Sequence, residues 1–116
     1  MDKFTEWCLY ADYTPFQEVF DIGVATSRAI IQYGKGTDPI DCGGKTEWDN
    51  GNGSLMRILP VCLYLYNRQK MICTSENESI YLIHNVSALT HAHLRSQIAC
   101  GIYYFMVKSV LSREGD

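Results

Sequence analysis

A glycine-rich turn, Gly51-Asn52-Gly53-Ser54, is the feature of the sequence best suited to binding chemistry. Glycine lets the backbone approach a ligand closely and present its N–H groups. Where a helix follows directly, these N–H groups and the helix dipole favour an anion such as phosphate. The same residues also suit an ordinary tight turn, so the turn alone leaves both interpretations open.

Two kinds of side chain could contact a ligand at this turn. Arg57 follows one helical turn later and could bind phosphate or carboxylate with two hydrogen bonds, or pair with an acidic loop residue. His91 and His93 are two residues apart and would point in different directions on a helix. We therefore expect one of them to contact a ligand, rather than both to hold a metal ion.

Carboxylates in the same region could supply a general base. Asp49 lies directly before the glycine-rich turn, and other acidic residues precede it: Asp38, Asp41 and Glu47. Such residues are also common in loops for conformational reasons alone. The sequence contains no Asp-Asp or Asp-x-Asp pair, so we predict no metal site from its own residues.

Composition limits the class of protein that can carry these residues. The chain has 116 residues, of which 47% are hydrophobic, and a formal net charge of -3 without a basic run. This excludes a disordered chain and disfavours a nucleic-acid-binding protein. We expect one domain spanning residues 1–116 and no membrane segment, because the longest uncharged apolar stretch has only ten residues.

The five cysteines are odd in number, contain no C-x-x-C pair and follow no secretory signal. We interpret them as reduced thiols of a cytoplasmic protein. Cys62 and Cys100 lie in apolar runs, where a thiol packs as a small hydrophobic side chain.

Helical patterns account for most of the chain and predict an all-α fold. We expect helices at 3–10, at 21–33 with Asp21 as N-cap and Gly34 as the stop, and after Ser54, where Pro60 allows a start near Leu59. Residues 34–53 should form a long loop, because they contain six glycines.

Two more helices are expected in the C-terminal half. Ser75-x-x-Glu78 is a capping-box pattern opening a helix that continues over 80–91. The last helix starts near Leu94, and its apolar run 98–107 predicts burial on most sides.

Five motifs together resemble the ADP-ribosylglycohydrolase family. They are Thr14-Pro15-Phe16, Phe20-Asp21-Ile22-Gly23, Cys42-Gly43-Gly44, Asn50 through Pro60 with its Gly-Asn-Gly turn, and Leu89-Thr90-His91-Ala92-His93. Their order and spacing match nearly the whole chain, and the family includes the dinitrogenase reductase-activating glycohydrolase and the ADP-ribosyl-acceptor hydrolases.

The resemblance implies an all-helical bundle in which ADP-ribose is cleaved from a modified side chain at its anomeric carbon. It further implies a binuclear Mg²⁺ or Mn²⁺ centre in the parent family. Gly51, Asn52, Gly53 and Ser54 would contact the ribose and diphosphate, and His91 would line the substrate cleft. Asp49 falls where some members carry an acidic residue proposed to act in catalysis.

The sequence departs from the family pattern at several places. The family's metal-binding Thr-Asp-Asp and Asp-x-Asp-Thr motifs are both absent, Leu94 replaces a common Pro, and Val24-Ala25 replaces a frequent Asn-Thr. We therefore expect a central fragment of the family's domain that binds no metal and is inactive alone.

Three functions stay open from the sequence. The chain could be a piece of a glycohydrolase, a non-catalytic module that binds ADP-ribose or an ADP-ribosylated protein, or a helical module that self-associates through the apolar faces of its helices. The third function predicts a homo-oligomer.

Overall fold

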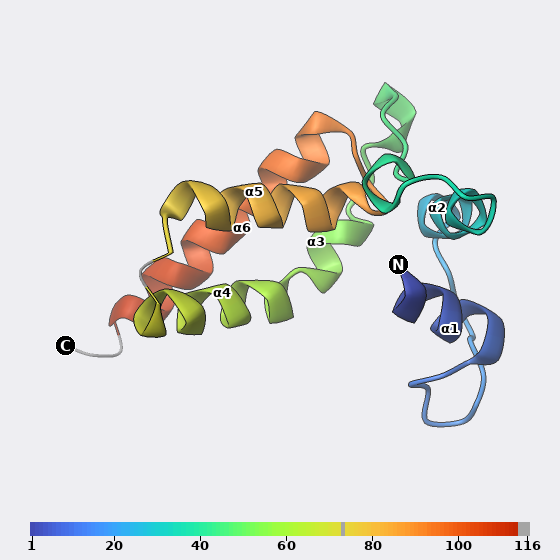
Figure 1. The fold of residues 1–116 in the computed structure, drawn as a ribbon, viewed down its shortest axis with the longest axis horizontal. Coiled ribbons are helices and arrows are strands. Elements are labelled where there is room, and N and C mark those ends of the chain that lie inside the picture. Colours follow the sequence, from blue (N-terminus) through green and yellow to red (C-terminus); the bar gives the residue numbers. More distant parts are fainter. Residues whose placement is uncertain (73, 114–116) are drawn as a thin grey trace.

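The computed structural model describes residues 1–72 and 74–113, and these form an all-α fold (Figure 1). Within these described residues, six α-helices and two short 3-10 helices follow one another. They are α1 (Asp2–Tyr10), α2 (Val24–Gly34), η1 (Pro39–Asp41), η2 (Glu47–Asp49), α3 (Gly53–Arg57), α4 (Leu59–Met71), α5 (Glu76–Ala88) and α6 (Leu94–Arg113). Within the described residues, no strand forms, and Gly44 and His91 make an isolated parallel β-bridge.

The hydrophobic core lies among α3, α4, α5 and α6, where α5 and α6 pack most extensively. The fully or almost fully buried side chains of this core are Ile58, Cys62, Leu65, Ile83, Cys100 and Tyr104. The expectation that Cys62 and Cys100 act as packing residues is therefore confirmed. Burial also raises the pKa of the Cys62 thiol to about 11, which keeps it protonated at neutral pH.

Helices α1 and α2 lie together at the other end of the molecule (Figure 1). The Tyr33 hydroxyl donates to a carboxylate oxygen of Asp2, which joins the two helices. The Arg57 guanidinium carbon lies 5.2 Å from the centroid of the Phe4 ring, so α1 also contacts α3. These contacts place α1 and α2 beside the glycine-rich turn.

The start of α2 differs from the predicted one. The helix begins at Val24 with Gly23 as its N-cap, and no side chain caps it. Asp21 is therefore not the cap, because the three residues from Asp21 to Gly23 stay outside the helix. The helix ends at Gly34, one residue beyond the predicted last residue, Tyr33.

The glycine-rich segment before the turn is less irregular than expected. It contains the 3-10 helices η1 and η2, and it is held to the α5–α6 connection at one point. There the Ala92 N–H donates to the Gly44 carbonyl at 3.0 Å. A Cβ on Gly43 would lie 2.2 Å from the Ala88 carbonyl oxygen, so only glycine fits this approach.

The helix after the glycine-rich turn is divided in two. α3 ends at Arg57, and α4 begins at Leu59 with Pro60 in its first turn. Proline is tolerated there because its missing N–H would have no partner in the first turn. The start near Leu59 is thus confirmed for the second of the two helices.

The predicted capping box of α5 is present. The Glu78 N–H donates to Ser75 Oγ at 3.2 Å, and the Ser75 N–H donates to a Glu78 carboxylate oxygen at 3.2 Å. The predicted end at His91 is wrong, since α5 stops at Ala88. The backbone then turns so that Ala92 can bond to Gly44.

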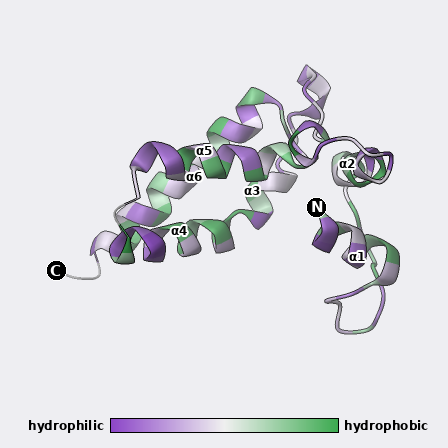
Figure 2. Cartoon of the chain, in the orientation of Figure 1, coloured by the Kyte–Doolittle hydropathy of each residue, from purple (hydrophilic) through white to green (hydrophobic). Residues whose placement is uncertain are grey.

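The predicted burial of α6 on most sides is wrong. One face packs into the core through Ser96, Cys100, Gly101 and Tyr104. The apolar stripe formed by Ile98, Ile102, Phe105, Met106 and Val110 stays 45–61% exposed. Among the described helices, α3, α4 and α5 pack against α6, and the hydropathy colouring shows apolar segments along this helix (Figure 2). Apolar residues occur on all faces of this helix, but only one face is buried.

Within the described part of the chain, no helix is long and apolar enough to cross a membrane. Cys8, Cys42, Cys62 and Cys100 are free thiols. The fifth cysteine, Cys73, lies outside the described residues.

Candidate functional site

The glycine-rich turn and His91 line a common pocket of about 370 Å³. Its other walls come from the N-terminal end of α2 and the residues just before it. The lining residues are Asp21, Gly23, Val24, Ala25, Thr26, Gly51, Asn52, Gly53, Met56 and His91. Its size falls at the lower end of the range found for small-molecule pockets. We call it the glycine–histidine pocket.

The His91 ring packs against two glycines of the turn. A Cβ built on Gly53 would lie 2.7 Å from His91 Cε1 and 3.0 Å from Nε2, closer than such atoms approach. A Cβ on Gly51 would lie 3.6 Å from Nε2. The absence of a side chain at Gly53 is therefore what lets the imidazole reach the turn. This explains physically why glycine and histidine occur together here.

Residues of α5 and α6 hold the turn in place. Ser96 Oγ donates to the Gly51 carbonyl at 3.1 Å. Ser87 Oγ lies 2.8 Å from Ser54 Oγ and 3.0 Å from the His91 carbonyl oxygen. Ser87 thus links the turn and the histidine directly.

Ser54 differs from the other predicted binding residues in its exposure. Its side chain is buried, bonded to Ser87 and 3.6 Å from Cys100 Sγ. Gly51 and Asn52 are exposed, and Gly53 is half-buried. The structure therefore places three of the four turn residues at the pocket and uses the Ser54 hydroxyl inside the fold.

The His91 ring is held in a fixed orientation and is kept neutral. Its Nδ1 lies 2.8 Å from Thr90 Oγ1, and both residues are buried. Burial and then the charge of Arg57 lower the pKa of His91 below its ordinary value of 6.5, although Asp49 opposes this. A neutral imidazole has one donor and one acceptor nitrogen. Because Nδ1 is occupied by Thr90, Nε2 is the ring nitrogen left to face the turn and a ligand.

Asp49 lies beside the turn, but it is not among the residues that line the glycine–histidine pocket. Its Oδ2 accepts hydrogen bonds from Thr46 Oγ1 at 2.5 Å and from the Thr46 N–H at 3.1 Å. These bonds lower the pKa of Asp49 below 3.8. A carboxylate stabilised in this way is a weak base, and it takes part in the capping box of η2.

Asp21 is a residue of the pocket that the sequence analysis missed. Asp21 is among the lining residues, is exposed, and its carboxylate has no hydrogen bond or ion pair with another described residue. No signal in the sequence indicated this position, because the motif Phe20-Asp21-Ile22-Gly23 fitted a helix N-cap at Asp21 equally well. Thr26 and Met56 were also missed.

Metal ligation does not fit the described part of the chain. No group of three or more His, Cys, Asp or Glu side chains there could hold a metal ion. His93, the second histidine of the pair, is half-buried, and its Nδ1 accepts from the Arg95 N–H at 3.2 Å. The donor set of the described residues therefore does not provide a binuclear centre.

Within the described residues, the chain is all-helical, and its glycine-rich turn packs against a buried, neutral histidine. The family model for ADP-ribosylglycohydrolase matches residues 1–116, the whole chain. The chain therefore belongs to the ADP-ribosylglycohydrolase family. Comparison with curated proteins and with solved structures gave no match.

Proposed function

We propose that the glycine–histidine pocket recognises the ADP-ribose part of an ADP-ribosylated protein. Membership of the ADP-ribosylglycohydrolase family suggests this class of ligand. The observation that carries the proposal is the convergence of Gly51, Gly53 and the Nε2 side of His91 at one pocket. Ribose hydroxyls both donate and accept hydrogen bonds, so they suit a neutral imidazole nitrogen.

The proposed chemistry of the pocket is recognition rather than hydrolysis by this chain alone. Asp49 is engaged by Thr46, and Asp21 is the acidic residue of the lining. One exposed carboxylate can accept a proton, but hydrolysis of a glycosidic bond ordinarily uses two groups of complementary protonation. In the parent family a Mg²⁺ or Mn²⁺ centre would supply further electrostatic stabilisation.

Titration calorimetry with ADP-ribose tests the recognition. The wild-type chain should bind, and Gly53→Ala should bind much more weakly because the new Cβ collides with the His91 ring. Gly34→Ala is the matched control, since its Cβ would meet nothing within 4 Å. Asn52 is exposed, so Asn52→Ala should fold normally while its affinity for ADP-ribose decreases.

The absence of binding to the wild-type chain would overturn the recognition proposal. The proposal would also be overturned if Asn52→Ala and Gly53→Ala bound ADP-ribose with the same affinity as the wild-type chain. The inactivity of the chain has a separate test, in which ADP-ribosyl-arginine and ADP-ribosyl-serine peptides are incubated with Mg²⁺ or Mn²⁺. We expect no release of ADP-ribose, and clear metal-dependent release would contradict this.

A second candidate function is self-association, favoured by the exposed apolar stripe on α6. The stripe carries no formal charge, so two copies could pack against each other without opposing like charges. In that case the chain is a homo-oligomeric module, with or without ADP-ribose. We place either function in the cytoplasm, a setting that the four free cysteines support.

A further inference from the structure

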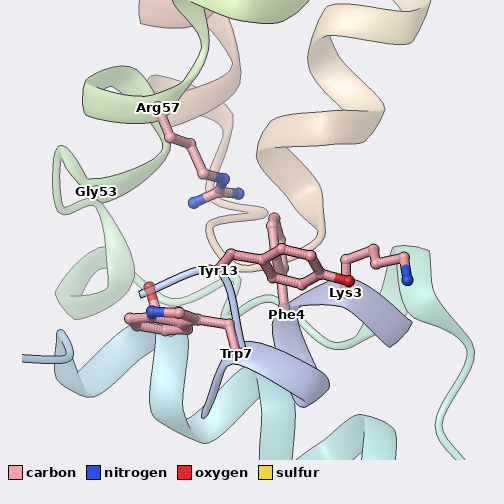
Figure 3. Close-up of a pocket in the computed structure, with 7 residues that line it drawn as sticks. Lys3, Phe4, Trp7, Tyr13, Gly53 and Arg57 are labelled. Atoms are coloured by element: carbon pink, nitrogen blue, oxygen red, sulfur yellow. The ribbon is translucent and has the colours of Figure 1, made fainter. Parts of the chain in front are cut away.

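A second pocket, of about 430 Å³, lies between α1, α2 and α3 (Figure 3). Its lining residues are Lys3, Phe4, Trp7, Tyr13, Thr26, Gly53 and Arg57. It shares Thr26 and Gly53 with the glycine–histidine pocket, but its walls are otherwise different. Three of its seven residues are aromatic. We call it the arginine pocket.

Arg57 directs a positive charge into this pocket from above in the view of Figure 3. Its Nη2 donates to the Val86 carbonyl at 3.1 Å, and its guanidinium lies over the Phe4 ring. Its Nε is buried without a hydrogen-bond partner. No carboxylate within residues 1–72 and 74–113 forms an ion pair with it.

The environment of Arg57 is therefore electrostatically incomplete. Burial lowers the pKa of its guanidinium; the nearby Cys100 thiol opposes this shift, but no carboxylate among the described residues forms an ion pair with Arg57. Taking a cation partly out of water without an anion is unfavourable. A bound anion would remove this cost.

The second cation of the lining does not contribute a free charge. Lys3 Nζ lies 2.8 Å from a Glu6 carboxylate oxygen and 5.6 Å from the Tyr13 ring centroid. The Tyr13 hydroxyl donates to the same Glu6 carboxylate at 2.6 Å. Lys3 and Glu6 thus neutralise each other, and among the described residues Arg57 is the cation of the pocket without an ion-pair partner.

From this arrangement we infer that the arginine pocket binds an organic carboxylate with an apolar or aromatic body. The carboxylate would pair with the Arg57 guanidinium, whose planar fork matches it. The body would pack against Phe4, Trp7 and Tyr13, whose rings offer a large apolar surface. A phosphate dianion fits less well, because the lining supplies one unpaired cation and little other polar surface.

The same chemistry could come from a free acid or from a peptide carboxylate. The probes are therefore 3-phenylpropionate and N-acetylphenylalanine, each compared with its amide, which has the same shape without the charge. We expect one or both acids to bind the full chain with a dissociation constant on the order of 1 mM, as expected for ligands of this size. Tighter binding of 3-phenylpropionate would indicate a free acid as the ligand, and tighter binding of N-acetylphenylalanine would indicate a peptide carboxylate.

The tryptophan side chains report where the probe binds. The sequence has two, and Trp7 lines the pocket, whereas Trp48 lies on η2 and is 88% exposed. In an NMR titration the Trp7 indole signal should shift and the Trp48 signal should stay unchanged. Equal shifts of both signals, or equal affinity for acid and amide, would overturn the proposal.

Variants separate the charge from the fold. Arg57→Gln should weaken binding by about tenfold or more, the effect of losing a charge-assisted hydrogen bond. Arg68→Gln on α4, which is exposed and outside the pocket, should leave it unchanged. Arg57→Gln also removes the hydrogen bond to the Val86 carbonyl, so it could affect folding as well as binding. A second variant, Trp7→Leu, keeps Arg57 and tests whether the aromatic lining of the pocket contributes to binding.

Both variants are first checked for cooperative thermal unfolding. If Arg57→Gln does not fold, weaker binding by Trp7→Leu still supports the proposal, and unchanged binding contradicts it. Binding of ADP-ribose by the wild-type chain is measured in parallel. Failure of the acids with retained ADP-ribose binding would overturn this proposal while leaving the function proposed for the glycine–histidine pocket intact.

Discussion

At the scale of single residues, the histidine of the Leu-Thr-His motif has the most constrained environment. The side chain of His91 bonds to Thr90, its ring packs on Gly53, and its backbone bonds to Ser87. The sequence identified this residue through a resemblance, but it did not reveal the packing on glycine. That contact joins residues far apart in sequence, and spacing alone does not predict such contacts.

The neutral state of His91 predicts a pH dependence of stability. The pKa of His91 is lower in the folded chain than its ordinary value of 6.5, so the unfolded chain binds the proton first as pH falls. The free energy of unfolding should therefore decrease as pH falls through about 6.5 toward the folded pKa, by about 1.4 kcal/mol for each unit of pKa shift. Thermal unfolding between about pH 8 and 5 measures this change.

A pair of variants assigns the effect. His91→Gln should flatten the pH dependence in this range, whereas His93→Gln should retain it. Asp49 has a lowered pKa and loses its contribution only at more acidic pH, so it does not interfere. If His91→Gln showed the same dependence of the free energy of unfolding on pH as the wild-type chain, the assignment to His91 would be wrong.

At the scale of elements, local signals predicted better than the burial of whole faces. The capping box of α5 depends on residues three positions apart, so the sequence was sufficient to find it. The same is true of Pro60 at the start of α4. The exposure of Ile102 and Phe105 on α6 was not predictable, because it depends on which neighbouring helices are present.

The capping box gives a second prediction. Ser75→Ala should lower the free energy of unfolding by about 1 kcal/mol, because the Glu78 N–H loses its acceptor at the start of α5. Ser109→Ala is the matched control, since Ser109 is exposed on α6 and makes no hydrogen bond with its side chain among the described residues. Urea unfolding measures the free energy of unfolding of both variants. An equal decrease in Ser75→Ala and Ser109→Ala would contradict a capping role for Ser75.

At the scale of the whole molecule, the structure has a packed end and an open end. Helices α3 to α6 enclose the core, whereas α1 and α2 meet them around the two pockets. Several large apolar side chains stay exposed, among them Phe16, Phe20 and the α6 stripe. The sequence predicted the class of fold correctly, but the pockets depend on how these two ends meet.

The exposed stripe gives the third prediction. Sedimentation velocity from micromolar to submillimolar concentration should show the wild-type chain associating. Ile102→Glu should shift the chain toward monomer, because it places a charge in the apolar contact. Ile31→Glu is the control, since Ile31 is 54% exposed on α2, away from the stripe. A monomer at all concentrations would exclude self-association.

The single bridge between Gly44 and His91 has a consequence for the order of folding. Contacts within α4 to α6 bury the apolar side chains of the hydrophobic core, whereas this bridge rests on the backbone hydrogen bond between Ala92 and Gly44 outside that core. The glycine–histidine pocket should therefore form after the core and open before it. Hydrogen exchange at the Ala92 amide should be faster than in the core helices, and a ligand that spans the turn and His91 should slow it.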